Sequence, residues 1–253
     1  GNIYTLIVGE NHIIVGTERD YYLFSRKGKF IRRLLIIGRG PEEFISPKFS
    51  KVIRNDIIYL SDNQKSRKFI YTIDLNTGRQ SKILRADEGL INSLIPDSDT
   101  TLLIISASVS MDYSANSILS TENSLIKQDL NGKLLHEVKL RNEKGFGLFP
   151  PPNYSMFSKN GTIIIESPRC NEIFLYSDFK LMTIWRNTYK TIYDESLFEQ
   201  NVPSANLINY SRDTMLFWMS STLYKGNRGY GSEGHFLMMD RVNNKLIAIR
   251  RLC

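Results

Sequence analysis

Short runs rich in Ile, Leu, Val, Tyr and Phe recur along the whole chain, and polar turns separate them. In many runs apolar and polar residues alternate, which is typical of a β-strand with one buried face. No segment keeps the apolar period of a helix over a helix-like length. The pattern therefore predicts an all-β fold.

The runs form a unit that repeats. Each unit has a short first run, two longer runs, a tight turn and a fourth run. The turn glycines Gly28, Gly78 and Gly132 are 50 and 54 residues apart (78 − 28 and 132 − 78). Glycine there supplies the left-handed backbone of a tight hairpin; in the fourth unit Phe179 and Lys180 stand where the glycine is expected. The units span residues 3–37, 50–85, 91–140, 154–187 and 206–251.

Four-stranded units at this spacing predict a β-propeller. One twisted antiparallel sheet cannot bury both of its faces alone, whereas sheets stacked around an axis bury their faces against each other. We expect residues 1–253 to form a single propeller domain with five visible antiparallel blades. Inner and middle strands then supply the core, with Ile14, Ile58, Leu103, Ile164 and Leu216 as examples.

The stretch KGKFIRRLLIIGRGPEEF (27–44) carries a family resemblance. It resembles a motif of the six-bladed, NHL-like β-propellers of Bacteroidetes, in which a strand after GKF ends in a G-x-G-P-x-E-[FY] loop. The segment DIIYLSD (56–62) and the strand after it also resemble the second blade of that family. The resemblance covers roughly residues 12–80, and only the blade period continues it. The matching loop residues are Gly38, Gly40, Pro41, Glu43 and Phe44.

The resemblance implies an exported protein, often a lipoprotein, without an assigned activity. We therefore expect the periplasm or the cell surface as its location, and contact with a membrane only through an N-terminal lipid anchor outside this sequence. Members of the family have six blades, but only five units are visible here. We expect these five to be part of a six-bladed ring; a ring with fewer blades is the alternative.

The GRGPEEF loop (38–44) has the glycines of a phosphate-binding loop but not its other features. Proline has no N–H to donate, two carboxylates follow it, and the next element reads as a strand. We interpret the loop as a sharp bend between blades, with Phe44 packed between them. Arg39 and Glu43 remain candidates to face a ligand.

The long connections are predicted to open on one face of the propeller, opposite the tight turns. They are residues 106–123 and 221–234 within blades, and 141–153 and 187–205 between blades. Long loops on a rigid scaffold often carry function, and aromatic and Arg side chains offer much contact area. Besides Arg39 and Glu43, the ligand-binding candidates are Tyr113, Arg169, Tyr224, Arg228, Tyr230, Glu233 and His235.

Charge and cysteine content exclude few classes of binding partner. The formal net charge of +7 permits an anionic partner, but the basic residues are spread along the chain, so we expect no nucleic acid. Cys170 and Cys253 form neither a disulfide framework nor a zinc site, although one bridge between them is possible. We expect no cofactor and no metal, since Asp56, Asp62 and Asp112 are scattered.

The expected function is non-enzymatic recognition of a ligand or partner on the long-loop face, with a glycan or a protein as its target. The alternative is an exported polysaccharide hydrolase or lyase with its site in the axial depression. Such an enzyme needs converging acid and base groups, and no motif shows convergence. The residues that would have to converge are Asp62, Glu122, Glu166, Arg169, Glu233 and His235.

Overall fold

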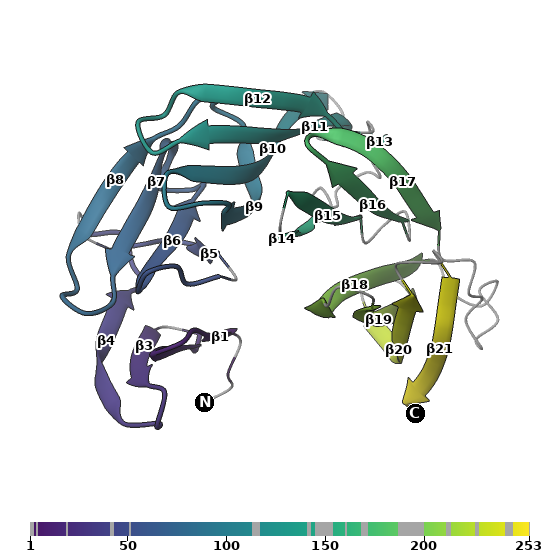
Figure 1. Ribbon diagram of the computed structural model, residues 1–253, viewed down its shortest axis with the longest axis horizontal. Helices are drawn as coiled ribbons and strands as arrows, with labels where there is room; N and C mark the ends of the chain where they lie inside the picture. Colours follow the sequence, from purple (N-terminus) through teal and green to yellow (C-terminus); the bar gives the residue numbers. More distant parts are fainter. Residues whose placement is uncertain are drawn as a thin grey trace. The chain divides into compact units, whose positions relative to one another are not determined.

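A computed structural model describes most of the chain (Figure 1). The described residues are 3, 5–18, 20–40, 43–50, 52–112, 117–140, 143–144, 154–159, 161–167, 172–186, 200–210, 214–225, 228–240 and 245–252. The chain divides into two compact units, residues 1–151 and 152–253. No membrane-spanning helix occurs among the described residues.

Three antiparallel sheets make up the first unit, and we call them blades 1 to 3 (Figure 1). Blade 1 consists of β1 (Thr5–Val8), β2 (His12–Gly16), β3 (Asp20–Ser25) and β4 (Phe30–Ile36). Blade 2 consists of β5 (Lys48–Phe49), β6 (Ile57–Asp62), β7 (Ser66–Asp74) and β8 (Gln80–Leu84). Blade 3 consists of β9 (Leu90–Pro96), β10 (Thr101–Asp112), β11 (Ser117–Asp129) and β12 (Leu134–Lys139), with β13 (Glu143–Lys144) added on β11.

Two further four-stranded sheets, blades 4 and 5, make up the second unit. Blade 4 consists of β14 (Ser155–Lys159), β15 (Thr162–Ser167), β16 (Glu172–Ser177) and β17 (Lys180–Arg186). Blade 5 consists of β18 (Gln200–Tyr210), β19 (Thr214–Lys225), β20 (Arg228–Asp240) and β21 (Lys245–Leu252). The strands of each blade pair in sequence order, so the all-β fold of four-stranded antiparallel blades is confirmed.

The tight turns between third and fourth strands have the predicted backbone. Gly28, Gly78 and Gly132 have φ values of +80°, +80° and +86°, in the left-handed region that glycine enters without steric cost. In blade 4 the same turn is made by Asp178 and Phe179, with φ of 46° and 63°. These two residues adopt the conformation without a glycine, at a steric cost that glycine would avoid.

Apolar faces of neighbouring blades form the core of the first unit. One cluster joins Ile7, Ile14 and Leu23 of blade 1 to Ile58 and Leu60 of blade 2, among others. A second cluster joins the opposite face of blade 2, through Tyr59, Ile70 and Ile83, to Ile91, Leu102, Ile104 and Ile126 of blade 3. The predicted core residues Ile14, Ile58, Leu103 and Ile164 are buried, whereas the side chain of Leu216 lies outside the described part of the structure.

The GRGPEEF segment forms the bend between blades 1 and 2, as predicted. Phe44 is 1% exposed, packs edge-on against Tyr71 at 5.0 Å between ring centroids, and belongs to the cluster between the two blades. The Gly38 N–H donates to the Phe44 carbonyl at 2.8 Å, and the Phe44 N–H donates to the Ile36 carbonyl at 3.0 Å. Pro41 and Glu42 lie outside the described residues.

Asp62 holds this bend against blade 2. Its carboxylate is fully buried, and Oδ2 accepts the backbone N–H groups of Ile45 at 2.6 Å and Ser46 at 3.2 Å. Oδ1 accepts the N–H groups of Gln64 and Lys65, both at 3.1 Å. Four donors surround one buried carboxylate, and their hydrogen bonds offset the cost of burying its charge. Asp62 therefore has a structural role in this blade.

Replacing Asp62 with Ala should leave four backbone N–H groups without their acceptor. We expect a loss of about 3 kcal/mol in the free energy of unfolding, because each buried unpaired donor carries a desolvation cost. Denaturant unfolding measures it. Asp99→Ala is the control, since Asp99 is exposed and its ion pair with Arg54 is worth under about 1 kcal/mol. Equal losses for both variants would contradict the assigned role.

Candidate functional site

Two of the predicted long loops are in fact strands. β10 and β11 continue to Asp112 and from Ser117, so the segment 106–123 is an extended hairpin with only residues 113–116 outside the described part. Likewise β19 and β20 continue through most of 221–234. The loop prediction was wrong because Ser, Gly and Asn in these segments read as loop residues. Long hairpin partners supply backbone hydrogen bonds that override such local preferences.

The hairpin of β10 and β11 extends beyond the other strands of blade 3. β9 pairs with β10 only as far as Ala107, and β12 pairs with β11 only from Ser124 onward. Beyond these points β10 and β11 pair with each other up to Asp112 and Ser117. The short strand β13, from the connection to blade 4, pairs with Ser120 and Thr121 of β11. The predicted loop is thus a β-structured projection.

Five of the predicted binding residues lie on the β19–β20 hairpin of blade 5. Tyr224 is in β19, and Arg228, Tyr230, Glu233 and His235 are in β20. The register places Glu233 opposite Ser221 and His235 opposite Met219. Tyr224 pairs with Gly229 and Leu223 with Gly231, so Tyr230 is the extra residue of a β-bulge. Bulges often occur next to functional sites because they change the direction of a side chain.

Two of the other four predicted binding residues, Arg39 and Glu43, share the bend between blades 1 and 2. Arg39 is exposed in the bend between blades 1 and 2. Glu43 is in the same bend, and its Oε2 accepts the Gly40 N–H at 2.7 Å. A Cβ atom on Gly38 would lie 2.0 Å from Oε2 of Glu43, so this carboxylate packs directly over the glycines. Tyr113 and Arg169 lie outside the described residues.

Residues considered for catalysis or a metal are spread over several blades. Asp62 is enclosed by four backbone donors, Glu122 is exposed on β11 opposite Ser108, and Glu166 is on β15 opposite Ser155. Asp112 pairs with Ser117 at the end of β10. Within the described ranges no three His, Cys, Asp or Glu side chains gather as metal ligands would. No converging acid and base pair is formed by those candidates whose side chains are described.

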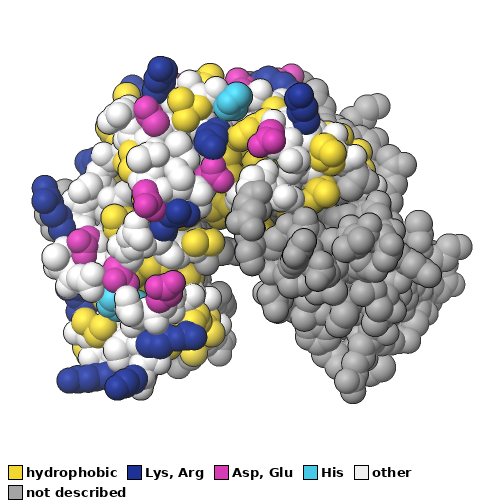
Figure 2. Space-filling view, viewed as in Figure 1, with side chains coloured by type: hydrophobic (Ala, Val, Ile, Leu, Met, Phe, Trp, Pro, Cys, Tyr) yellow, Lys and Arg dark blue, Asp and Glu magenta, His cyan; other side chains and the backbone are white. Residues whose placement is uncertain are grey.

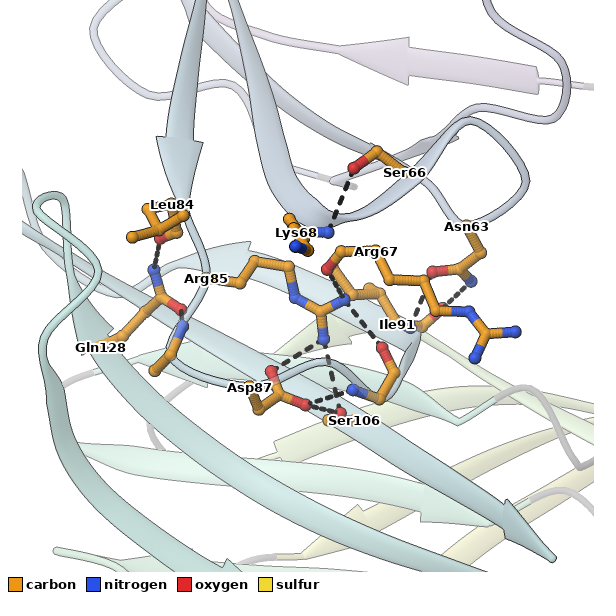
Figure 3. Close-up of polar contacts among 12 residues, drawn as sticks. Asn63, Ser66, Arg67, Lys68, Leu84, Arg85, Asp87, Ile91, Ser106 and Gln128 are labelled. Atoms are coloured by element: carbon orange, nitrogen blue, oxygen red, sulfur yellow. Dashed lines mark hydrogen bonds and ion pairs between the residues drawn. The ribbon is translucent and has the colours of Figure 1, made fainter.

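A buried polar cluster that the sequence did not reveal joins blades 2 and 3 (Figure 3). The Arg85 side chain is fully buried, and its Nη1 donates to the carbonyls of Arg67 at 2.6 Å and Gly89 at 2.7 Å. Nη2 donates to Oδ1 of Asp87 at 2.8 Å. The Ser106 hydroxyl donates to Oδ2 of Asp87, which also accepts the Gly89 N–H at 3.0 Å. Arg85 thus links the end of blade 2 to the start of blade 3.

Burial shapes the electrostatics of this cluster. Desolvation lowers the pKa of Arg85, and the Asp87 carboxylate opposes that shift. Because an arginine pKa starts so high, the guanidinium stays charged at physiological pH and needs Asp87 as its partner. Gly89 leaves no room for a side chain, since a Cβ there would lie 2.2 Å from the Ser106 hydroxyl oxygen. The cluster is closely packed, with the Arg85 Nε buried and unpaired.

Two side-chain amides flank the cluster and bind the backbone of the neighbouring blade. Asn63 of blade 2 accepts the N–H of Ile91 and donates to its carbonyl, both at 3.0 Å. Gln128 of blade 3 accepts the N–H of Ala86 and donates to the Leu84 carbonyl, again both at 3.0 Å. Each amide forms the pair of donor and acceptor bonds that the backbone of an adjacent strand would otherwise form. These bonds fix blades 2 and 3 in one register relative to each other.

Asp62 and Ser106 occupy equivalent positions in successive blades. Ile57 pairs with Asp74 in blade 2 and Thr101 pairs with Asp129 in blade 3, and Asp62 and Ser106 follow Ile57 and Thr101 by the same number of residues. In blade 2 the strand itself supplies the carboxylate that holds the incoming connection. In blade 3 the strand supplies a hydroxyl, and the carboxylate is Asp87 of the connection. Both arrangements place a carboxylate where the connection enters the blade: Asp62 is fully buried, and the Asp87 side chain is 23% exposed.

Acidic and basic side chains are interspersed on the surface of the described residues that Figure 2 shows, without a continuous basic area in that view. Several basic residues are neutralised locally, for instance Arg33 by Asp20 and Lys127 by Asp97. The excess of positive charge is therefore not concentrated on this side as a nucleic-acid-binding surface requires.

Comparison with known proteins gives structural matches only. No protein-family model and no curated protein sequence matches the chain. A member of the DUF4221 family from Bacteroides vulgatus aligns with a TM-score of 0.61 and 11% identity, over 99% of this chain and 82% of that chain. The chain is a β-propeller. At this identity the match shows a shared fold.

Two further solved structures also align with this chain. The acylaminoacyl peptidase of Pyrococcus horikoshii aligns with a TM-score of 0.50 and 11% identity, over 99% of this chain but only 45% of the peptidase. The β-propeller domain of the Trilobed protease from Pyrococcus furiosus aligns with a TM-score of 0.46 and 13% identity, over 99% of this chain and 84% of that domain.

Breaking the Arg85–Asp87 pair from one side should be costly. In Arg85→Met the Asp87 carboxylate loses its charged partner, and we expect the free energy of unfolding to fall by about 3 kcal/mol. The double variant Arg85→Met, Asp87→Leu should recover part of this loss, because no unpaired charge remains. Chemical unfolding of the two variants and of Asp87→Leu measures the coupling. Strictly additive losses would show that the pair does not act as a unit.

Proposed function

We propose that this chain is a non-enzymatic, ligand- or partner-binding propeller, and that recognition occurs on the extended hairpins of its blades. The observation that carries the proposal is the β10–β11 hairpin, which continues beyond β9 and β12 and takes up β13. The end of this hairpin pairs with neither β9 nor β12, so it adds little to the core of its blade. It does add a structured surface on which a partner can bind.

The residue types on the hairpins favour a glycan or a protein as the target. Tyr224, Arg228 and Tyr230 flank the turn of the β19–β20 hairpin, and Tyr113 belongs to the connection between β10 and β11. Tyrosine offers a flat apolar face with a polar end, which suits stacking on a sugar ring or burial in a protein interface. Arg adds planar donors for carboxylates.

Catalysis is the weaker interpretation for this chain. A polysaccharide hydrolase or lyase needs an acid and a base close to one substrate bond. In the described residues Asp62 and Asp87 are instead held by backbone N–H groups, a hydroxyl and Arg85. Neither carboxylate is placed to exchange a proton with a bound substrate.

We also propose that the chain belongs with the NHL-like propellers of Bacteroidetes, and that it functions in the periplasm or at the cell surface, anchored through a lipid outside this sequence. The GRGPEEF bend supports this proposal, because its glycines, Glu43 and Phe44 form a compact structure in which each of these residues has a packing role. Fractionation of the native host after labelling with a fatty-acid analogue tests the location and the anchor.

Shortening the β10–β11 hairpin should abolish binding and leave the fold intact. In the test variant a two-residue Asn-Gly turn replaces residues 109–121. This turn joins Ser108 to Glu122, which already lie opposite each other in the hairpin. The melting temperature should change by no more than a few degrees, because the pairs with β9 and β12 remain. Binding is measured on an array of immobilised neutral and acidic polysaccharides and on cell-envelope proteins by cross-linking.

Unchanged binding by the shortened variant would remove the β10–β11 hairpin from the proposal. Release of new reducing ends from any polysaccharide on the array, by the unmodified chain, would favour the enzymatic alternative instead. A matched control, Asn131→Asp, alters the tight turn between β11 and β12 at the opposite end of the same blade and keeps Gly132. This control should bind as the unmodified chain does.

The double variant Arg228→Ala, Tyr230→Ala tests the second hairpin. We expect at least a tenfold weaker affinity for any array ligand, because aromatic and Arg side chains dominate binding surfaces. The melting temperature should stay within a few degrees, since both residues lie beside the turn of the hairpin. Loss of folding would show that the two side chains are structural. Titration by biolayer interferometry, together with a thermal melt, separates the two results.

A further inference from the structure

Asn131 differs in its surroundings from the other asparagines of the first unit. It lies exposed in the tight turn between β11 and β12, and Gly132 follows it. Its backbone N–H donates to Oδ1 of Asp129 at 2.8 Å, whereas its side-chain amide forms no hydrogen bond with the described residues. Asn131 is the only described asparagine that precedes a glycine, since Asn160 lies outside the described part of the chain.

Hydrogen bonds hold the side chains of the other described asparagines in blades 1 to 3. Asn63 forms two bonds with the backbone of Ile91, and Asn76 donates to the Asp56 carboxylate at 3.3 Å. Because these amides are fixed in place, the Asn131 side chain alone among them is free to turn toward its own main chain. The asparagines with bonded side chains are Asn11, Asn55, Asn63, Asn76, Asn92 and Asn123.

The turn does not require an asparagine at this position. In blade 3 the Gly132 N–H donates to the Asp129 carbonyl at 3.2 Å, and the Gly28 N–H makes the equivalent bond in blade 1 at 2.9 Å. Both glycines have positive φ, +86° and +80°. Lys27 therefore occupies in blade 1 the place that Asn131 occupies in blade 3. Because the same turn forms with a lysine, the Asn131 side chain is not needed to build it.

We propose that Asn131 is a site of spontaneous deamidation, and that one of its products weakens the contact between blades 2 and 3. The Gly132 backbone nitrogen attacks the side-chain carbonyl carbon of Asn131 and closes a five-membered imide. The side-chain nitrogen leaves as ammonia, with the proton that the backbone nitrogen loses. Glycine favours the attack because no Cβ shields its nitrogen.

Water then opens the imide on one side of its nitrogen or the other. Breaking the bond to the side-chain carbonyl gives aspartate, with the main chain as before. Breaking the bond to the main-chain carbonyl gives isoaspartate, in which the main chain runs through the side-chain carbons and is one carbon longer. No electrons are transferred, and water is the only co-reactant.

The hydrogen bond from Gly132 to Asp129 limits the rate in the folded chain. The Gly132 nitrogen attacks only while this bond is open, and its length of 3.2 Å is at the long end of the usual range. Turns at the surface open locally at little cost in free energy, without global unfolding. The reaction therefore proceeds from the folded protein through local opening of one turn.

Isoaspartate at this position disturbs a contact within the first unit. A Cβ atom on Gly132 would lie 2.6 Å from the carbonyl oxygen of Leu84, so the turn packs closely on the end of β8 in blade 2. The same carbonyl accepts the side-chain amide of Gln128 at 3.0 Å. An additional main-chain carbon lengthens the turn where there is no room for it. Aspartate leaves the main chain unchanged, so the isoaspartate product alone should weaken this contact.

Peptide mapping of the folded chain tests the site. The chain is kept at body temperature and mildly alkaline pH, then digested at mildly acidic pH and analysed by mass spectrometry. Asn131 should deamidate at least about tenfold faster than Asn63 and Asn76, because their amides are bonded and larger residues follow them. In Asn131→Gln the same peptide should stay unmodified, because the longer side chain closes only a larger ring. Equal rates at the three asparagines, or reaction only in a urea-unfolded sample, would overturn the proposal.

Thermal melts test the effect on the contact between blades. The experiment uses an Asn160→Gln background, which removes the other Asn-Gly pair of the chain. Cation exchange isolates the deamidated protein, and peptide mapping gives its isoaspartate content. The isoaspartate form should melt at least about 3 °C below the fresh protein. Asn131→Asp has the same charge with a normal main chain, so it should melt within about 1 °C of the fresh protein.

Two results would contradict the effect on the contact. An isoaspartate form that melts with the fresh protein would show that the turn accommodates the longer main chain. An equal fall in the melting temperature of Asn131→Asp would assign the effect to the new charge.

Discussion

Burial of sheet faces against one another is the constraint on which the rest of this structure depends. A four-stranded antiparallel sheet with apolar side chains on both faces is not stable alone in water. Blade 2 satisfies the requirement on both sides, since Ile58 and Leu60 pack on blade 1 while Tyr59 and Ile70 pack on blade 3. Every connection between blades has to allow this face-to-face contact, which explains the compact bend at Gly38 and Gly40.

Apolar packing alone leaves the relative position of two blades loosely specified, because apolar contact has no preferred direction. The buried polar groups at each joint supply that direction. Asp62 receives four backbone donors between blades 1 and 2, and Arg85 with Asp87 fills the corresponding place between blades 2 and 3. Each such group is costly when unpaired, so only the blade arrangement that satisfies it is stable. The polar groups that specify the arrangement and the apolar groups that stabilise it thus lie in the same contacts between blades.

The same division of roles separates the scaffold from the recognition surface that we propose. Blade interiors carry the aliphatic clusters, whereas the β10–β11 hairpin extends past β9 and β12, and the β19–β20 hairpin extends past β21. Building a recognition surface from paired strands instead of free loops reduces the conformational entropy that a partner must overcome on binding. In the function that we propose, residues near the two hairpin turns set the target, and they can change without altering the blade contacts.

Much of the architecture followed from the sequence, because strand alternation and turn chemistry are local. The glycines at 28, 78 and 132 predicted the turns, and the spacing between them predicted the blades. The loop around Phe44 also predicted that this residue packs between blades. The hairpins were missed for the opposite reason. Residues 106–123 and 221–234 have the composition of loops, and only pairing with a partner strand made them β-structure.

Tertiary structure alone decided which polar residues meet. Arg85 and Ser106 are far apart in sequence and come together because two sheets stack, and no local pattern encodes that contact. From the sequence Asp62 is a candidate for catalysis, but its four backbone donors give it a structural role. Blade 1 shows both sources at once. The sequence by itself determined that Ile13, Ile14 and Leu23 are apolar. Contact with blade 2 decided that Ile14 and Leu23 are fully buried, because burial depends on what lies across the face and not on the residues that form it.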